Sequence, residues 1–451
     1  MAKKNKNVEV EDDTPVEQET DVAKLSKLLI KAFNKDEAKT GKVAWNLASD
    51  DNPTDVKEWI STGNTLLDYC ISNRRNGGLP VGKLVEIMGE EASGKSLMCA
   101  EIAAETQRRG GIVGYLDAEN AMSPEFAQQI GVDLRKMIYL QPGTVEEAGE
   151  QIEKMILMTR QKAPNQLVTI IWDSTAQTPT QLEIEGNYEI NMNVQMEKPK
   201  AMAKMMRKLT QTLGRERILL VFTNQLKFKP GVMYGDPLFA PGGKAVPYAA
   251  SVRIKLTRGK TAKEGDDVND TDKEYSASEE NVMGVHTKAS IVKNRCGPPL
   301  RKCKFFISFA HGIEDEQSWF QFLHDEKVMT KNNGWWTFEE FRPVLASAYK
   351  EIAADAEKTL EKAKTELDKE KEKTAKKQLK EVDDLIAKAE GWQFRTSDWP
   401  AVLDNTPGLR KWVEDKLEQL LVIKYGDKLP TPDPESLLET EQFISDLEDG
   451  E

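Results

Sequence analysis

The stretch Leu84–Ser96 reads LVEIMGEEASGKS and decides the fold. The spacing G-x-x-x-x-G-K-[ST] of a phosphate-binding loop is met by Gly89, Gly94, Lys95 and Ser96. Glycine lets backbone N–H groups point at phosphate oxygens, lysine adds a charge near the β and γ phosphates, and serine supplies a hydroxyl to Mg²⁺. The apolar run before the loop and the helical pattern after it distinguish it from a chance Gly/Ser turn. The stretch therefore predicts a site for ATP and Mg²⁺.

The composition indicates a globular chain with one large core and one or two smaller domains. Of its 451 residues, 39% are hydrophobic and 31% are charged. No apolar run reaches membrane-spanning length, and the start of the sequence lacks the apolar segment of a signal peptide. We therefore expect a cytoplasmic protein without a membrane partner.

Cysteines, histidines and net charge exclude little else. The four cysteines form no C-x-x-C pair and the three histidines lack metal-ligand spacing, so reduced thiols and structural or surface histidines are expected. The net charge of -12 is uneven, because acidic residues concentrate in 9–21 and 433–451. Net charge therefore does not decide whether the partner is a nucleic acid.

The N-terminal region contains one apolar stripe. Residues 1–20 are polar and are expected to be disordered, whereas 21–58 are expected to form a helix and a linker. The stripe consists of residues three and four apart, Leu25, Leu28, Leu29 and Phe33. Such a helix packs either on its own domain or on a neighbouring subunit, and the residues alone do not choose.

The region 59–325 has the pattern of an α/β core with a mostly parallel central sheet. Continuous apolar runs alternate with helical segments, as in strands that are buried on both faces. Strands are expected at 84–89, 111–119, 137–140, 167–174, 218–225, 250–256 and 289–295, with helices at 97–109, 145–161 and 198–213. Ligands of such sheets bind beyond the carboxyl ends of the strands, where Glu119, Asp173 and Gln225 lie.

Two of these residues have a candidate role on chemical grounds. Asp173 closes an apolar strand, as does the magnesium-side carboxylate of many phosphate-loop proteins, although an aspartate there can also cap a helix. Glu119 follows a strand and is a candidate for orienting or deprotonating an attacking water.

Two segments after strands contain Gly, Pro and aromatic residues and are expected to be loops, 183–192 and 227–244. The second mixes cations with rings, namely Lys227, Phe228, Lys229, Tyr234, Phe239 and Lys244. This mixture suits single-stranded nucleic acid, but an ordinary surface loop has the same composition. A third segment, 258–283, is polar and is expected to be a flexible excursion between strands.

The region 326–430 is expected to form a small α+β domain rich in aromatic residues. A charged helical arm interrupts it at 345–390, and its three-four apolar rhythm fits one long helix or a helical hairpin. The arm is either a solvated projection or a coiled-coil dimer. The last residues, 431–451, form an acidic tail.

The sequence resembles the bacterial RecA recombinases and their phage relatives over about residues 25–340. The similar segments keep the family's order: ISTGNTLLD at Ile60, GLPVGKLVEIMGEEASGKS at Gly78, LDAENAMSPEFAQQIGVDLRKMIYLQP at Leu116, DSTAQTPTQLEIEG at Asp173, NQLKFKPGVMYG at Asn224, PGGKAVPYAASVRIKL at Pro241 and IVKNR at Ile291. The set is far more specific than the phosphate loop alone.

The resemblance implies an ATP-dependent DNA recombinase. Such proteins form helical filaments on single-stranded DNA, pair it with homologous double-stranded DNA and exchange strands, with ATP hydrolysis stimulated by DNA. DNA replication and repair proteins are implied as further partners. The helix at Leu25 would then dock on the adjacent subunit.

The resemblance also implies residue roles. The catalytic set would be Glu119, which activates water, Lys95, the γ-phosphate sensor Gln225, and Lys293 and Arg295, which reach the neighbouring subunit's ATP. The nucleotide would lie on Gly89, Glu90, Glu91, Ala92, Ser93, Gly94, Lys95, Ser96, Leu97 and Phe126, with Ser96 and Asp173 on Mg²⁺. DNA would contact Gly186, Asn187, Tyr188, Lys227, Phe228, Lys229, Gly231, Met233, Tyr234, Gly242, Gly243 and Lys244.

The sequence departs from the family pattern in a few places. Pro247 replaces a residue that is often cationic, and Ser123 stands where an acid is common. These departures bear on subunit contacts and nucleotide affinity. Independently of them, two alternatives to the recombinase stay open: a DNA-coating scaffold in which hydrolysis only times release, and a motor helicase of the same fold. Intact Glu119, Lys293 and Arg295 favour the enzyme over an inactive scaffold.

Overall fold

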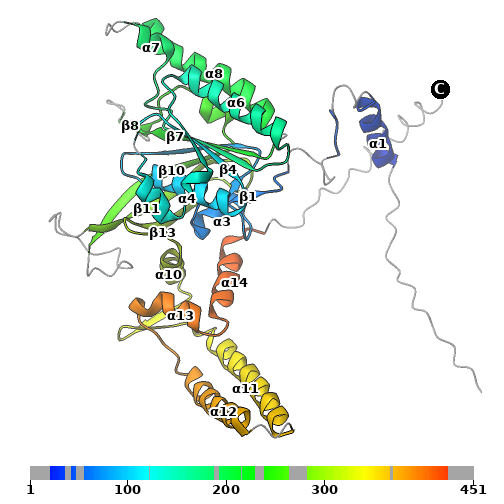
Figure 1. Ribbon diagram of the computed structural model, residues 1–451, viewed down its shortest axis with the longest axis vertical. Coiled ribbons are helices and arrows are strands. Elements are labelled where there is room, and N and C mark those ends of the chain that lie inside the picture. Colours follow the sequence, from blue (N-terminus) through cyan, green and yellow to red (C-terminus); the bar gives the residue numbers. More distant parts are fainter. Residues whose placement is uncertain are drawn as a thin grey trace, which may run out of the picture. The chain divides into compact units, whose positions relative to one another are not determined.

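The computed structural model describes residues 21–35, 42–46, 55–120, 122–186, 192–214, 216–228, 238–263, 282–365 and 369–424 (Figure 1). The chain divides into two units, Met1–Asp55 with Lys424–Glu451, and Val56–Ile423. The segments predicted as a disordered N-terminus (1–20) and as an acidic tail (431–451) lie outside the described residues.

The first unit contains helix α1, Asp21–Phe33, at the position that the apolar stripe predicts. Two residues of the stripe are largely exposed within the chain, Leu28 at 63% and Phe33 at 69%. After the helix, the amide of Asn34 donates to the carbonyl of Ala44 at 2.8 Å, which folds the following segment back. The apolar face of α1 is thus available for another surface.

The second unit is built on a nine-stranded sheet within the described residues, in the order β13-β12-β11-β10-β3-β7-β6-β4-β5. The strands from β10 to β5 pair in parallel, and β11, β12 and β13 extend the sheet in antiparallel fashion. Their bounds are β3 Leu84–Gly89, β4 Ile112–Asp117, β5 Met137–Leu140, β6 Val168–Asp173, β7 Ile218–Gln225, β10 Val252–Lys263, β11 Val282–Asn294, β12 Lys302–Ser308 and β13 Gly312–Glu314. Two short strands pair beside it, β1 Trp59–Ile60 and β2 Leu79–Pro80.

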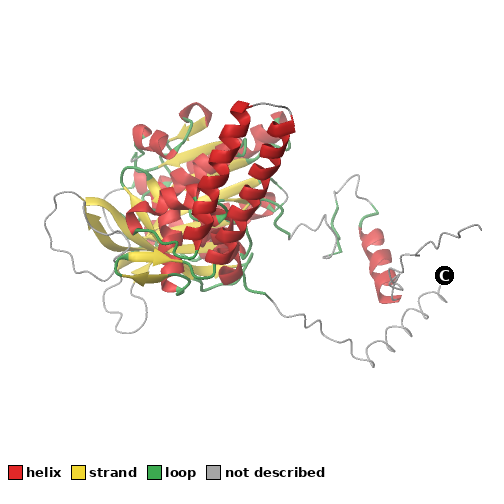
Figure 2. Cartoon of the chain, turned by 90° about the horizontal axis from the view of Figure 1, so that it is seen from below, coloured by secondary structure: helices red, strands yellow, loops and turns green. Residues whose placement is uncertain are grey.

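Helices cover both faces of this sheet (Figures 1 and 2). One core contains residues of α3 and α4, such as Ile71 and Ile102, and the other contains residues of α6 and α8, such as Ile152 and Met206. Their bounds are α3 Thr65–Ser72, α4 Lys95–Arg108, α5 Pro124–Ile130, α6 Val145–Lys162, α7 Gln181–Glu185, α8 Met192–Leu213 and α9 Ala245–Ala249. Strands β3, β6 and β7 are buried on both sides as their continuous apolar runs predict, whereas Ile138 and Tyr139 of the edge strand β5 are exposed. The α/β class with a mostly parallel sheet is confirmed.

One expected loop and the start of one expected helix differ from the structure. The segment expected as a loop at 183–192 begins inside α7, because Thr180 and Glu183 form a reciprocal cap that starts a helix there. Helix α8 begins at Met192, before the expected start at Lys198, and continues through Pro199. Those two sequence predictions were wrong at these boundaries.

The excursion expected at 258–283 is also strand at both ends. Strand β10 continues to Lys263 and β11 begins at Val282, so the two form a long antiparallel ribbon. Threonine and valine at cross-strand positions such as Thr261 and Val285 favour pairing even though the segment is polar overall. Residues 264–281 lie outside the described ones.

A third core follows the sheet and is rich in aromatic rings. It packs α10 Asp315–Asp325, α13 Trp399–Asn405 and α14 Leu409–Leu421 around Phe338, Trp399 and their neighbours, beside β14 Thr330–Asn332 and β15 Trp335–Thr337. Rings of Phe338 and Phe394 stack with centroids 5.8 Å apart. We call this the C-terminal core.

The predicted charged arm is a helical hairpin, formed by α11 Arg342–Thr365 and α12 Lys369–Ala389. It leaves and rejoins the C-terminal core at adjacent points, since Trp336 and Phe394 are bridged by backbone hydrogen bonds of 2.8 and 2.9 Å. Of the two alternatives that the sequence left open, one long helix or a hairpin, the structure shows the hairpin.

Candidate functional site

The phosphate loop connects β3 to α4 in a conformation that only its own residues fit. Gly94 has a φ of 91°, and a Cβ there would lie 2.4 Å from Cδ1 of Ile307. A Cβ on Gly89 would lie 2.7 Å from the carbonyl oxygen of Leu256 on the neighbouring strand. Gly94 is therefore required mainly by its backbone angle, and Gly89 by the close approach of a neighbouring backbone oxygen.

The predicted nucleotide residues form one turn at the carboxyl end of β3. Glu90, Glu91, Ala92 and Ser96 are exposed, whereas the Ser93 hydroxyl turns inward and donates to the carbonyl of Glu90 at 2.8 Å. The backbone of this turn is thereby fixed, and its exposed edge can receive phosphate oxygens.

The Lys95 ammonium lies across the loop. Its side chain is only 8% exposed, and its Nζ donates to the carbonyls of Gly89 at 3.2 Å and Glu90 at 2.7 Å. Burial lowers the pKa of Lys95, and the nearby carboxylates of Asp173 and Glu119 partly offset that effect. A phosphate anion at the loop would favour the charged form in the same way.

The Asp173 carboxylate lies at the end of β6, 7% exposed. It accepts hydrogen bonds from the Tyr115 hydroxyl at 2.8 Å and from the Thr223 hydroxyl. The next described helix begins at Gln181 and is capped by Thr180, so Asp173 does not act as a helix cap. An ionised carboxylate has about four acceptor positions. Asp173 therefore keeps acceptor capacity for a cation.

Glu119 and Gln225 touch each other. The Gln225 Nε2 donates to Glu119 Oε1 at 3.1 Å, and the Ser174 hydroxyl donates to the same oxygen at 2.5 Å. On its other side, Gln225 Oε1 accepts from Gln177 Nε2 at 3.1 Å. The sequence could place these residues only at the ends of separate strands. In the structure they form one series of hydrogen bonds at the carboxyl ends of β6 and β7.

Sequence reasoning missed three residues that support this series of hydrogen bonds. Ser174 and Gln177 belong to the DSTAQ segment that carries the family resemblance, which was the available signal. Asp117 is buried at the end of β4 and accepts from the backbone N–H of Glu119 at 3.0 Å and the Tyr139 hydroxyl at 3.0 Å. Asp117 therefore orients the turn that presents Glu119.

Ser123 has a structural role. Its hydroxyl caps α5 by accepting from the backbone N–H of Phe126 at 3.3 Å. The Phe126 ring is half-buried and packs on the core that contains Leu97 and Met98. The Phe126 ring is therefore held on the same side of the sheet as α4.

Lys293 and Arg295 lie together, away from the phosphate loop of their own chain. Lys293 is opposite Arg253, which pairs with Glu86 rather than with Gly89 at the carboxyl end of β3. The Lys293 ammonium donates to the carbonyls of Pro247 at 2.8 Å and Tyr248 at 3.0 Å. Burial and the nearby Arg295 lower the pKa of Lys293. Lys293 and Arg295 therefore lie toward the amino end of β3, whereas the phosphate loop follows its carboxyl end.

The predicted DNA-binding residues lie on segments that follow β6 and β7, beyond the hydrogen bond between Glu119 and Gln225. Gly186 ends α7, and Lys227–Phe228 (β8) pairs with Leu238–Phe239 (β9), leaving Phe228 64% exposed. Gly242 and Gly243 have positive φ values before α9, and Lys244 is exposed there. Asn187, Tyr188, Lys229, Gly231, Met233 and Tyr234 lie outside the described residues.

Lys198, on α8, links the two segments and was not predicted. It donates to the carbonyl of Ala176 at 2.8 Å. Burial lowers its pKa, Glu183 opposes that shift, and Lys227 adds to it. The α7 segment and the β8 segment therefore lie within electrostatic reach of one half-buried cation.

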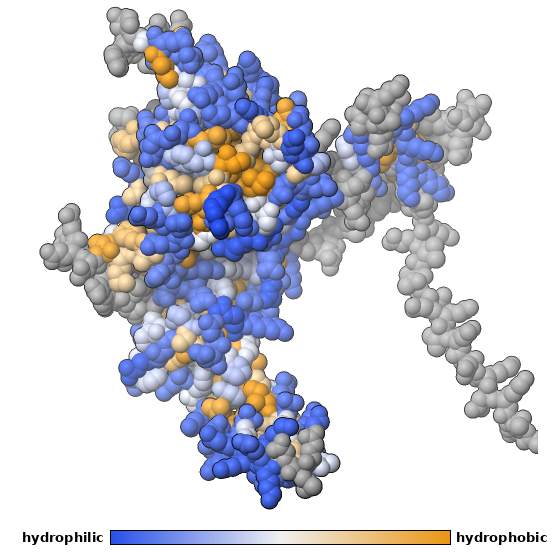
Figure 3. Space-filling view, in the orientation of Figure 1, coloured by the Kyte–Doolittle hydropathy of each residue, from blue (hydrophilic) through white to orange (hydrophobic). Residues whose placement is uncertain are grey.

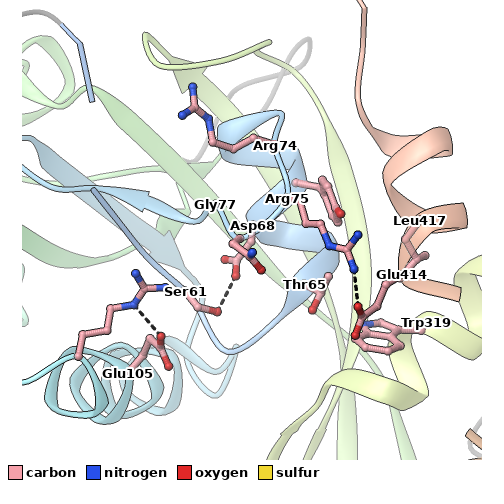
Figure 4. A pocket seen from close by; sticks show the side chains of 13 residues that line it. Ser61, Thr65, Asp68, Arg74, Arg75, Gly77, Glu105, Trp319, Glu414 and Leu417 are labelled. Atoms are coloured by element: carbon pink, nitrogen blue, oxygen red, sulfur yellow. Dashed lines mark hydrogen bonds and ion pairs between the residues drawn. The ribbon is translucent and has the colours of Figure 1, made fainter. Parts of the chain in front are cut away.

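A separate pocket of about 330 Å³ lies where α3 meets the C-terminal core (Figure 4). Arg75 forms ion pairs there with Glu414 at 2.5 Å and Asp415 at 2.7 Å, so α14 is fastened to the segment after α3. Asp68 accepts from the Ser61 and Thr62 hydroxyls at 2.5 and 2.8 Å, yet burial raises its pKa to about 8. Arg75 and Arg109, which line this pocket, are already ion-paired, and none of the lining residues belongs to the phosphate loop.

The described residues contain no group of three or more side chains suited to holding a metal ion alone. A magnesium ion that is bound with substrate phosphates needs only one or two protein ligands. The hydroxyl and carboxylate oxygens of Ser96 and Asp173 have the donor chemistry that Mg²⁺ prefers. In the same part of the chain, no helix has the length and apolarity to span a bilayer.

The fold and the site together define a phosphate-loop ATPase with its active residues at the carboxyl ends of a parallel sheet. The family model of the RecA N-terminal domain matches residues 27–314. The chain is 34% identical to Protein RecA of Ruminococcus albus over 332 residues, which cover 74% of this chain and 77% of that protein. It is 32% identical to Protein RecA of Paracoccus denitrificans over 321 residues, 71% of this chain and 83% of that protein.

The chain therefore belongs to the RecA family. It is a DNA-dependent ATPase that acts as a DNA recombinase in recombination and repair. The resemblance seen in its motifs is confirmed.

Proposed function

We propose that this recombinase hydrolyses ATP at the phosphate loop through Glu119. Lys95 and the loop amides would hold the β and γ phosphates, and bound Mg²⁺ on Ser96 and Asp173 would neutralise charge on them. Glu119 would take a proton from a water molecule. The oxygen of that water would attack the γ-phosphorus, and the bond from this phosphorus to the bridging oxygen of the β-phosphate would break. Two donors to Glu119 Oε1, Ser174 and Gln225, support this role because they fix the carboxylate.

The contact between Gln225 and Glu119 is the observation that carries the proposal of DNA-stimulated hydrolysis. Gln225 ends β7, and two residues later the chain enters β8 at Lys227. A DNA strand that orders the segment after β8 would reposition Gln225, and Gln225 would reposition Glu119. By linkage, ATP would strengthen DNA binding by the same factor that DNA strengthens ATP binding.

We also propose that the active site is completed by a second subunit in a helical filament. Lys293 and Arg295 lie toward the amino end of β3, away from the phosphate loop of their own subunit. They therefore suit the ATP of a neighbouring subunit better than the ATP of their own. Helix α1, with Leu28 and Phe33 exposed, would pack on the adjacent copy. The expected domain bounds and the remaining site assignments belong to this proposal.

Strand exchange requires room for two DNA molecules. Single-stranded DNA would lie on the segments at Gly186 and at Lys227 to Lys244, where exposed Phe228 can stack on a base. The homologous duplex would approach the antiparallel part of the sheet, where exposed Lys288 and Lys304 are direct cross-strand partners. Like charges placed opposite each other are unfavourable. A phosphate backbone would relieve that repulsion.

The remaining partners and location follow from this activity. We expect replication and repair proteins to load or remove the filament, and we place its action in the cytoplasm, where bacterial and phage DNA is accessible. Mg²⁺ and ATP are the expected cofactor and substrate.

The test is ATP hydrolysis with and without single-stranded DNA, at two protein concentrations, in the parent and in Lys293→Ala. We expect stimulation by DNA that rises with protein concentration and is lost in Lys293→Ala. Lys411→Ala, which changes an exposed lysine of α14, is the matched control and should behave as the parent. Equal rates with and without DNA would overturn the proposal.

A further inference from the structure

The helical hairpin closes its apolar seam on itself. Its inward positions are buried small or branched residues, Ala356 and Ala363 on α11 and Ala375, Val382 and Ala389 on α12. The seam keeps the three-four rhythm of a coiled coil inside one chain. The hairpin therefore needs no second copy to fold, and the face of it that is seen in Figure 3 is mostly hydrophilic.

Charge is segregated along the hairpin. We call residues 358–365 and 369–377 the distal half; counted with the three residues between them, which lie outside the described ones, this stretch has eight lysines against five carboxylates in the sequence. The part nearer the C-terminal core, 342–357 with 378–389, has four cations against six carboxylates. One end of a projecting element is thus basic although the whole chain has a net charge of -12.

Several distal lysines are available to an outside anion. Lys362, Lys369 and Lys373 are exposed and form no ion pair with a carboxylate of the described residues. Lys376 is also exposed and bonds Glu372 at 2.6 Å, a contact that competes weakly with an outside anion. Lys369, Lys373 and Lys376 recur every three or four residues, so they line one face of α12 over about 10 Å.

The composition of the distal half restricts its partner. The sequence has no aromatic residue between Tyr349 and Trp392, so stacking on unpaired bases is not provided for. The strongly exposed large apolar side chains described on the hairpin are Val344, Ile352 and Leu385, all outside the distal half, so its described residues lack the apolar centre of a protein interface. What remains is a set of lysines, which suits sequence-independent contact with phosphates.

We propose that the distal half of the hairpin contacts the phosphate backbone of duplex DNA, apart from the DNA-binding segments of the sheet. The inference rests on the proposed function in taking DNA to be the polyanion. The hairpin would add duplex affinity to a subunit whose ATPase site it does not touch.

The test compares two variants of the full chain with equal charge change. Lys369→Gln with Lys373→Gln alters the distal half, and Lys350→Gln with Lys388→Gln alters two exposed lysines of the other part. Binding to a labelled duplex and to a labelled single strand is measured by fluorescence anisotropy at 50 to 200 mM salt. Single-strand-stimulated ATP hydrolysis is measured beside it.

We expect the distal variant to bind duplex DNA more weakly and to keep its hydrolysis. The slope of log affinity against log salt should fall by about 0.9 for each phosphate that the variant no longer neutralises, so by about 2. The ratio of affinities at the two salt limits should then shrink about tenfold. The control variant should resemble the parent.

Three results would overturn the inference: duplex slopes that are unchanged, slopes that fall equally in both variants, or an equal weakening of binding to single-stranded DNA. Absence of DNA-stimulated hydrolysis in the parent would instead mean that the proposed function fails. The two failures are therefore distinguishable.

Discussion

Replacing Glu101 by glutamine should stabilise the protein at alkaline pH and have little effect at acidic pH. Glu101 lies on α4, one face of which supports the phosphate loop, and is only 8% exposed. Its Oε1 accepts from the backbone N–H of Ile313 at 3.2 Å. Burial raises its pKa from 4.5 to about 7, which that hydrogen bond and the charge of Arg108 only partly oppose.

The sign follows from proton binding. Between pH 4.5 and about 7 the folded chain keeps a proton on Glu101 that the unfolded chain releases, so stability falls as pH rises through this window. Glutamine has no proton to lose. With 1.36 kcal/mol for each pKa unit, the gain from Glu101→Gln is about 1 kcal/mol at pH 5 and about 3 kcal/mol at pH 8.

The assay is urea unfolding of the parent and Glu101→Gln at pH 5, 6, 7 and 8, followed by circular dichroism. The difference in free energy of unfolding should grow by about 2.5 kcal/mol across the series and level off above pH 7. Glu105→Gln, four residues along α4 and ion-paired with Arg108, is the matched control and should not gain stability as pH rises. A difference for Glu101→Gln that is independent of pH would refute the reasoning.

Three further predictions concern the site. Gln225→Ala should keep ATP binding and lose stimulation of hydrolysis by DNA, since it removes the 3.1 Å hydrogen bond to Glu119; unchanged stimulation would remove Gln225 from the sensor role. Lys227→Ala with Lys229→Ala should weaken single-strand binding and lower its salt slope by about 1.4, or about 0.7 for each lost phosphate contact, and a parental slope would take that segment out of the DNA site. Ser123→Ala should destabilise α5 by about 1 kcal/mol, seen as a lower melting temperature, whereas Ser123→Asp should retain the cap.

The sheet could be predicted from the sequence because each buried strand is a continuous apolar run between turn residues. The runs that end at Gly89, Asp173 and Gln225 occupy β3, β6 and β7 within a residue of the expected bounds. Their order could not be predicted in the same way. Spatial order depends on which helix crosses which face, and that is decided by side-chain fit between segments far apart in the chain.

The sequence predicted which residues belong to the site better than it predicted the contacts between them. Glu119 and Gln225 were placed at carboxyl ends, but their mutual hydrogen bond depends on β4, β6 and β7 being close neighbours in the sheet. The ribbon of β10 and β11 was missed because polar residues conceal a pairing that depends on the partner strand. Lys198 was missed because nothing in the local sequence of a helix indicates that one of its lysines is half-buried against another segment.

The backbone bridge between Trp336 and Phe394 makes the hairpin a removable module. Because the chain leaves and returns at paired residues, and the Thr337 hydroxyl also donates to the carbonyl of Trp392 at 2.9 Å, a short turn could join the two sides without stretching the core. The same junction offers a place where a reporter domain can be grafted while recombination is watched.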